Sequence, residues 1–218
     1  GLLQEVIREA RRDPRRLVLT EGNDPRVVKA ASVLAGEGIA TPILLGLRDE
    51  IVTVAEEVGV DLEGVEILLP KQSPDFDAYV GEYLQVNRRR GATPATARAD
   101  MARRTEFGMM MVRSGDVDGI VVGATRPYAE AIRPALKLIG SSGRACGMTT
   151  VLTRERTLFF ADTTVNIDPD AETLVEITRL VVEHVRSYDV EPRVAMLAFA
   201  NFGSVRDEST RKMARAAE

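Results

Sequence analysis

Small and polar residues follow three apolar segments of this chain, and these junctions carry the groups best suited to bind an anion. They occupy residues 20–24, 122–126 and 200–204. In a parallel sheet, strand ends face helix N-termini, where backbone N–H groups and the helix dipole favour negative charge. The first junction contains Glu21 and Asp24. Two carboxylates make a poor phosphate site, so a tight turn with a helix cap is favoured there.

The second and third junctions are the better candidates for ligand contact. Gly123 permits close approach of a ligand to the backbone. Arg133 lies on the helix expected after this junction. Its forked guanidinium could hold a phosphate or a carboxylate, although an arginine in such a position is more often a solvated surface group. The third junction contains Asn201 and Ser204, and it fits ligand contact and a plain turn equally well.

Other groups of polar residues are weaker evidence for a functional site. Asp162, Asn166 and Asp168 offer oxygen ligands to a hard cation, but Asp168 is better explained as the cap of the next helix. We therefore predict no metal site. His184 is the only histidine and Cys146 the only cysteine, which argues against an imidazole-rich metal site and against a nucleophile–base pair. No glycine-rich Rossmann or Walker loop is present, and we predict no catalytic residue within this chain.

Strand-like and helix-like apolar patterns alternate along the chain. This alternation predicts an α/β fold with mostly parallel sheets covered on both faces. The expected strands are residues 17–19, 43–45, 65–69, 119–122 and 194–199. The expected helices end near residue 13, start at residues 25, 93 and 208, and span 49–58, 75–90, 107–112, 127–139 and 168–188. Residues 148–152 and 157–160 are expected to form a hairpin, near which a first domain (1–145) gives way to a second (146–218).

Composition argues against several classes of protein. The 29 lysines and arginines are outnumbered by 33 acidic residues, which leaves a net charge of −4, whereas nucleic-acid binders usually carry a basic surplus. No apolar run approaches the roughly 20 residues that cross a bilayer, and the chain does not begin like a signal peptide. A lone cysteine fits a reducing compartment. We expect a cytoplasmic globular protein with no nucleic-acid or membrane partner.

The junctions and their flanks resemble the phosphate acetyltransferase family. The motifs occur in family order: RLVLTEGNDPRV at 16–27, FGMMMV at 107–112, GDVDG at 115–119 and IRPAL at 132–136. The resemblance covers essentially the whole chain. It implies two α/β domains with an interdomain cleft, as in isocitrate and isopropylmalate dehydrogenases. The family's Ser-Arg pair and the aspartate proposed as general base belong to a C-terminal closing segment, which we expect to be absent from residues 1–218.

One branch of this family is matched more closely than the other. The segments ADTTVNIDP at 161–169 and NFGS at 201–204 are similar to the phosphotransacetylase-like C-terminal domain of bacterial NADP-dependent malic enzymes. Ala200 stands where those proteins usually have serine. The IRPAL segment is instead closer to the catalytic phosphotransacetylases, so the anion contact of Arg133 is expected to be retained.

The resemblance implies a regulatory domain that binds acetyl-CoA or a related CoA ester and forms a homo-oligomer. NADP and a divalent metal ion would serve the malic-enzyme part of the same polypeptide, which decarboxylates malate to pyruvate. The implied ligand contacts are Arg133 for a CoA phosphate or the pantetheine path, Gly123 and Thr125 for backbone approach, and Asn201 and Ser204 for the opposite wall. The alternatives are a phosphate acetyltransferase that moves acetyl between acetyl phosphate and CoA, and a scaffold that only forms oligomers.

Overall fold

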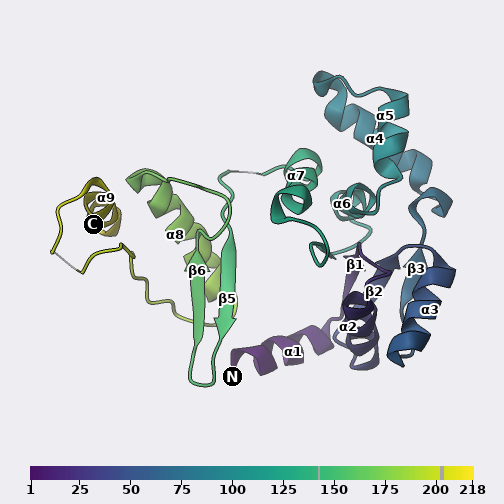
Figure 1. Cartoon of the computed structure of the whole chain (residues 1–218), viewed down its shortest axis with the longest axis horizontal. Helices are drawn as coiled ribbons and strands as arrows, with labels where there is room; N and C mark the ends of the chain where they lie inside the picture. The colour runs from purple at the N-terminus through teal and green to yellow at the C-terminus, as the bar shows by residue number, and fades with distance from the viewer. Residues whose placement is uncertain (142, 202–203) are drawn as a thin grey trace. The chain divides into compact units, whose positions relative to one another are not determined.

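The chain divides into two compact units, residues 3–140 and residues 141–218 (Figure 1). The computed structural model describes residues 1–141, 143–201 and 204–218. The sequence predicts a change of domain between residues 145 and 146, a few residues after the first unit ends in the chain. That boundary stays a prediction.

The first unit is built on a parallel four-stranded sheet with the order β3-β2-β1-β4. Its strands are β1 (Arg15–Leu19), β2 (Ala40–Leu45), β3 (Glu66–Leu68) and β4 (Gly119–Val121). Leu19 pairs with Leu44 of β2 on one side and with Val121 of β4 on the other. The strand order therefore reverses at β1, and the crevice between the carboxyl ends of β1 and β4 is a topological switch point, where open α/β sheets bind ligands.

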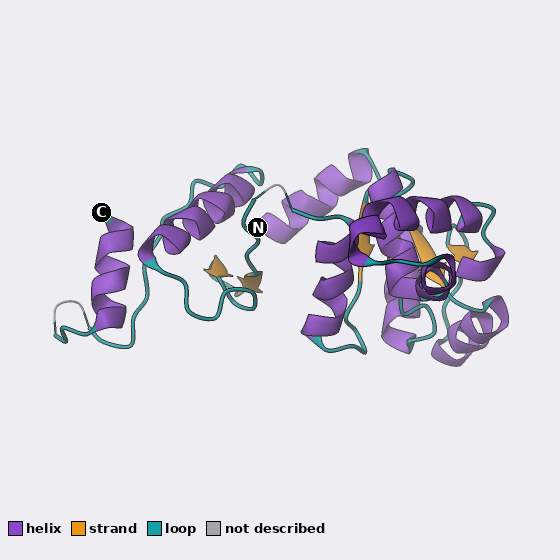
Figure 2. Ribbon diagram, turned by 90° about the horizontal axis from the view of Figure 1, so that it is seen from above, coloured by secondary structure: helices purple, strands orange, loops and turns teal. Residues whose placement is uncertain are grey.

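Helices cover both faces of this sheet (Figure 2). The covering helices are α2 (Pro25–Gly36), α3 (Arg48–Val58), α4 (Phe76–Asn87), α5 (Pro94–Met101), α6 (Arg104–Ser114) and α7 (Tyr128–Leu138), with short 3-10 helices at Pro70–Gln72 and Arg88–Arg90. The N-terminal helix α1 (Leu2–Arg12) precedes β1 and has no buried residue. Asp24 caps α2 and Thr93 caps α5, each followed by a proline. This confirms the predicted starts of both helices. Among the residues described, no helix is long and apolar enough to cross a membrane.

Neighbouring residues of each central strand point into two different cores. Val18 and Ile43 are fully buried against α4, α5 and α6. Leu19 and Leu44 are buried on the other face, against α2 and α3. A parallel strand that is buried on both faces has no polar alternation, which is why these segments appear in the sequence as unbroken apolar runs.

The second unit consists of a hairpin and two helices among its described residues. The antiparallel strands are β5 (Met148–Leu152) and β6 (Thr157–Ala161), and the helices are α8 (Ala171–Arg186) and α9 (Glu208–Ala217). The predicted hairpin is confirmed. The predicted cap of α8 is wrong: Asp170 caps the helix by accepting the N–H of Thr173 at 2.8 Å, whereas Asp168 pairs with Lys212 at 2.6 Å. A capping side chain accepts the N–H two or three residues further on, and Asp170 stands at that distance from Thr173 whereas Asp168 does not.

The strand predicted at residues 194–199 is also wrong, because this segment is irregular. Within the described part of the unit, β5 and β6 pair only with each other, so no strand offers this segment the N–H and C=O groups that a ladder requires. Leu197 and Phe199 are 66% and 74% exposed. An apolar run therefore becomes a strand only when a neighbouring strand is there to pair with it.

The close approach of β1 and β2 gives a test of the first unit. A Cβ on Gly22 would lie 2.7 Å from the backbone oxygen of Leu45, so we expect Gly22→Ala to lower the free energy of unfolding by about 1–3 kcal/mol. A Cβ on Gly81, inside α4, would meet no atom within 4 Å. Gly81→Ala should therefore raise it by about 0.5–1 kcal/mol. Urea unfolding followed by circular dichroism measures both, and effects of the same sign would contradict this geometry.

Candidate functional site

The carboxyl ends of β1 and β4 are joined by the side chain of Glu21. This residue follows β1 and is only 8% exposed. The N–H of Gly123 donates to its two carboxylate oxygens at 3.1 and 3.2 Å, and the N–H and hydroxyl of Thr125 donate to Oε1 at 3.1 and 3.3 Å. Convergent backbone N–H groups form an anion-binding concavity. In this protein, Glu21 supplies the anion.

Gly123 and Thr125 lie at the switch point, where the sequence predicts ligand contact. Gly123 has a φ of 111°, a conformation that side-chain-bearing residues rarely adopt, so glycine permits this turn. The N–H groups of both residues already donate to Glu21, and their contact with a ligand stays a prediction. The role of Glu21 cannot be predicted from residues 20–24 alone, because its partners Gly123 and Thr125 lie about a hundred residues away in the chain.

A second side chain, that of Arg26, also binds the turn at residues 123–125. Nη2 of Arg26 donates to the carbonyl oxygen of Ala124 at 2.8 Å. The same guanidinium donates to Asp24 at 3.0 and 2.9 Å, and its hydrogen bond lowers the pKa of Asp24. The N–H groups of Gly123 and Thr125 are thus bound by Glu21, and the carbonyl oxygen of Ala124 is bound by Arg26. These contacts fix the turn that leads into α7.

Arg104 lies over the neighbouring carboxyl ends of β1 and β2. Its Nη1 donates to Oδ1 of Asn23 at 2.7 Å, and its Nη2 is 3.8 Å from a carboxylate oxygen of Glu50. A Cβ on Gly46 would lie 3.4 Å from the guanidinium carbon, so the absence of a side chain there leaves room for this group. Arg104 adds a positive charge to the sheet edge. The role of Arg104 cannot be predicted from the sequence, because nothing in the neighbouring residues distinguishes it from Arg103.

Arg133 lies on α7 and is exposed. A polar cluster attaches this helix to α4 and α5. Lys137 of α7 donates to the hydroxyl of Tyr83, which donates to Asp100, and the ammonium of Lys137 lies 3.3 Å from Asp100 and 4.7 Å from the centre of the Tyr83 ring. Burial and the hydrogen bond to Asp100 raise the pKa of Tyr83. The helix that carries Arg133 is therefore held by charge-assisted hydrogen bonds as well as by packing.

Asn201 and Ser204 lie in the second unit, in a turn that closes on itself. The N–H and hydroxyl of Ser204 donate to the carbonyl oxygen of Asn201 at 3.0 and 2.8 Å. Asn201 also borders a hollow of about 460 Å³ beside α9. Phe202 and Gly203 of the same junction lie outside the described residues. Asn201 and Ser204 lie close together in the second unit, and Gly123 and Thr125 lie close together in the first. A ligand site that combines these residues with Arg133 stays a prediction.

Asp162 organises the loop between β6 and α8. Its carboxylate accepts backbone N–H groups at 2.8–3.0 Å from Gly147, Thr164, Val165 and Asn166. Burial opposes ionisation of Asp162, but these hydrogen bonds outweigh it and hold its pKa well below the ordinary value. No group of three or more histidine, cysteine or acidic residues is placed to hold a metal ion in the described ranges. Hydrogen bonds within the chain explain the position of the Asp162 carboxylate.

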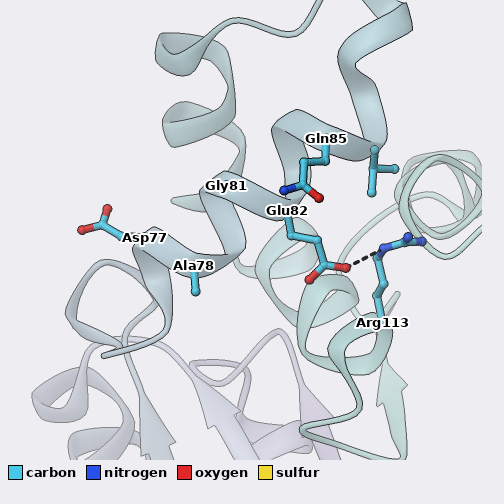
Figure 3. Close-up of a pocket in the computed structure, with 7 residues that line it drawn as sticks. Asp77, Ala78, Gly81, Glu82, Gln85 and Arg113 are labelled. Carbon is cyan, nitrogen blue, oxygen red and sulfur yellow. Dashed lines mark hydrogen bonds and ion pairs between the residues drawn. The ribbon is translucent and has the colours of Figure 1, made fainter.

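A hollow of about 660 Å³ lies on α4, with Arg113 of α6 at its border (Figure 3). Nε of Arg113 donates to Glu82 at 2.8 Å, and the hydroxyl of Ser114 donates to the same carboxylate at 2.9 Å. The residues that line the hollow belong to α4 and α6, and none of them lies at the end of a strand. Because the charge of Arg113 is already paired, this hollow is a poorer anion site than the sheet edge.

Comparison with known proteins identifies two groups of relatives. Residues 1–218 match the family model "Phosphate acetyl/butaryl transferase". The chain is 36% identical to the phosphate acetyltransferase of Nitratidesulfovibrio vulgaris and 37% identical to the NADP-dependent malic enzyme of Escherichia coli. These alignments cover 97% and 99% of this chain, but the chain spans only 30% and 29% of the two relatives.

A solved structure has the same fold. The EutD phosphotransacetylase from Staphylococcus aureus superposes with a TM-score of 0.87 at 28% identity, over 99% of this chain and 66% of the other. This likeness confirms the predicted α/β fold with a parallel sheet.

The hydrogen bonds of Asp162 predict a pH-dependent effect on stability. Asp162→Asn should lower the free energy of unfolding by about 1–3 kcal/mol at pH 7, because an amide cannot accept all of these N–H groups. The native pKa of Asp162 is lowered, so its stabilisation is complete above the unfolded value of about 3.9 and is lost as pH falls through the native pKa. Urea unfolding at a series of pH values should show the difference from wild type shrinking in acid.

Asp168→Asn is the matched control for this experiment. Asp168 is exposed and pairs with Lys212 at the surface, so its replacement should change the free energy of unfolding by less than about 1 kcal/mol. Equal losses for the two variants would show that the hydrogen bonds of Asp162 do not stabilise the loop.

Proposed function

Because this chain belongs to the phosphate acetyl/butaryl transferase family, we propose that it binds acetyl-CoA as a regulatory domain of a protein related to NADP-dependent malic enzymes. The observation that carries the proposal is the exposed Arg133 on α7, the helix that follows the switch point of the sheet. A guanidinium in this place suits the phosphates of CoA. Similarity of nearly the whole chain to the E. coli malic enzyme supports the regulatory role.

The proposed ligand contacts follow from the two turns. Arg133 would pair with a CoA phosphate or lie along the pantetheine chain. Gly123 and Thr125 are exposed, and since their N–H groups hold Glu21, they would contact the ligand through the outer surface of the turn. Asn201 and Ser204 are proposed for the opposite wall, where the exposed side chain of Asn201 offers both a hydrogen-bond donor and an acceptor.

Regulation requires a catalytic part and a second arrangement of the protein. We propose that acetyl-CoA stabilises one arrangement of a homo-oligomer, a coupling typically worth about 1–3 kcal/mol. NADP and a divalent metal ion would belong to the malic-enzyme part of the polypeptide. This chain contains no glycine-rich dinucleotide loop, and its described residues offer no metal-binding cluster.

The alternative function is catalytic transfer of acetyl between acetyl phosphate and CoA. Similarity to phosphate acetyltransferases and to a phosphotransacetylase structure favours it equally. In that reaction a base removes the thiol proton of CoA, the sulfur attacks the acetyl carbonyl carbon, and phosphate leaves with the electron pair of the broken C–O bond. Cations must stabilise the phosphate. Arginines at the sheet edge suit this role, but we assign no residue of this chain as the base.

The role of Arg133 is testable by direct binding. We expect Arg133→Ala to weaken acetyl-CoA binding about tenfold or more, as loss of one charge-assisted contact would do. Arg154→Ala is the matched control, because Arg154 is also exposed but lies in the turn of the β5–β6 hairpin. Calorimetric titration of wild type and both variants measures the effect. Equal affinities for the three proteins would exclude Arg133 from the site.

One further assay separates the three candidate functions. The full polypeptide that contains this chain is mixed with acetyl phosphate and CoA, and thioester formation is followed. Binding of acetyl-CoA without turnover supports the regulatory domain, whereas turnover supports the transferase. If acetyl-CoA neither binds nor raises the melting temperature, the scaffold is favoured.

A further inference from the structure

Glu21 occupies the place where a ligand anion would be expected in this fold. Open α/β sheets commonly bind anionic ligands through backbone N–H groups at the switch point. In this chain, the N–H groups of Gly123 and Thr125 both donate to Oε1 of Glu21 at 3.1 Å. These two backbone N–H groups at the sheet edge therefore donate to a side chain of the protein itself.

The carboxylate is held by hydrogen-bond donors. The hydroxyls of Thr20 and Thr125 donate to it at 3.4 and 3.3 Å, in addition to the two backbone N–H groups. A buried carboxylate is expensive unless such donors compensate the lost hydration. The arrangement is the one that an oxyanion ligand would require, and here the oxyanion is attached to the end of β1.

Backbone packing limits any movement of Glu21. The next residue, Gly22, lies so close to β2 that a Cβ would come within 2.7 Å of the Leu45 oxygen. On the opposite side, Arg26 donates to the carbonyl oxygen of Ala124 at 2.8 Å and holds the turn in place. Both the carboxylate and its donors are therefore fixed.

We propose that Glu21 is a specificity-determining internal anion, which closes the backbone oxyanion site at the switch point to phosphates and other ligand anions. Its charge repels a ligand anion from this turn, and its oxygens occupy the donors. Negative groups of a ligand must then be bound by arginine side chains around the turn. The inference goes beyond the proposed function, because it holds whichever ligand the protein binds.

Removal of the side chain should reopen the site to a small oxyanion. In the full chain carrying Glu21→Ala, we expect sodium formate to shift the amide NMR signals of Gly123 and Thr125 in a saturable manner. Sodium chloride at equal ionic strength should not, and the wild-type signals should respond to neither salt. Formate should also raise the melting temperature of this variant more than chloride does.

Glu21→Gln keeps the test decisive if Glu21→Ala does not fold. The amide fills the same space but provides a single neutral acceptor, so we expect the N–H groups of Gly123 and Thr125 to exchange with solvent about tenfold faster or more. Unchanged exchange in Glu21→Gln, or a formate response no larger than the chloride response in Glu21→Ala, would overturn the inference. None of these measurements involves acetyl-CoA, so failure of this inference and failure of the proposed function are distinguishable.

Discussion

The hydrogen bonds between Glu21 and the turn at residues 123–125 organise the ligand-facing edge of the first unit. They attach the end of β1 to the end of β4, which are neighbours in the sheet although about a hundred residues separate them in the chain. The turn then leads into α7, which Lys137 attaches to the hydroxyl of Tyr83 on α4. The position of Arg133 thus depends on the hydrogen bonds of Glu21 just before α7 and on those of Lys137 near the end of the helix.

The two units differ in how far their own residues bury the apolar segments. In the first unit, β1 and β2 have cores on both faces, and their strands are paired on both sides. In the second, the described strands pair only with each other, and the apolar segment around Leu197 and Phe199 lies exposed. The unpaired segment is not buried, because an unpaired strand cannot be buried without leaving N–H and C=O groups unsatisfied. Pairing alone does not ensure burial, since β5 and β6 are paired with each other and still largely exposed.

Sequence patterns predict the features of this fold that depend on neighbouring residues. The β1 and β2 runs, the prolines after Asp24 and Thr93, and the charged turn of the hairpin are all local, and the structure confirms them. The errors arise where distant partners or fine geometry decide. Residues 194–199 lack a partner strand, and Asp170 reaches the N-terminus of α8 where Asp168 does not. At the candidate site, Gly123 and Thr125 follow β4, but no local pattern reveals that their N–H groups donate to Glu21.

The closed turn at residues 123–125 has a consequence for how solution conditions affect this protein. Backbone N–H groups recognise an anion by rigid, short-range geometry, whereas exposed guanidinium groups attract it through a field that dissolved ions screen over about 10 Å at 0.1 M salt. Because Glu21 fills the rigid site, an anion at this edge depends on groups such as the exposed Arg133. Its affinity would therefore follow the ionic strength of the surroundings more closely than in a sheet whose switch point is open.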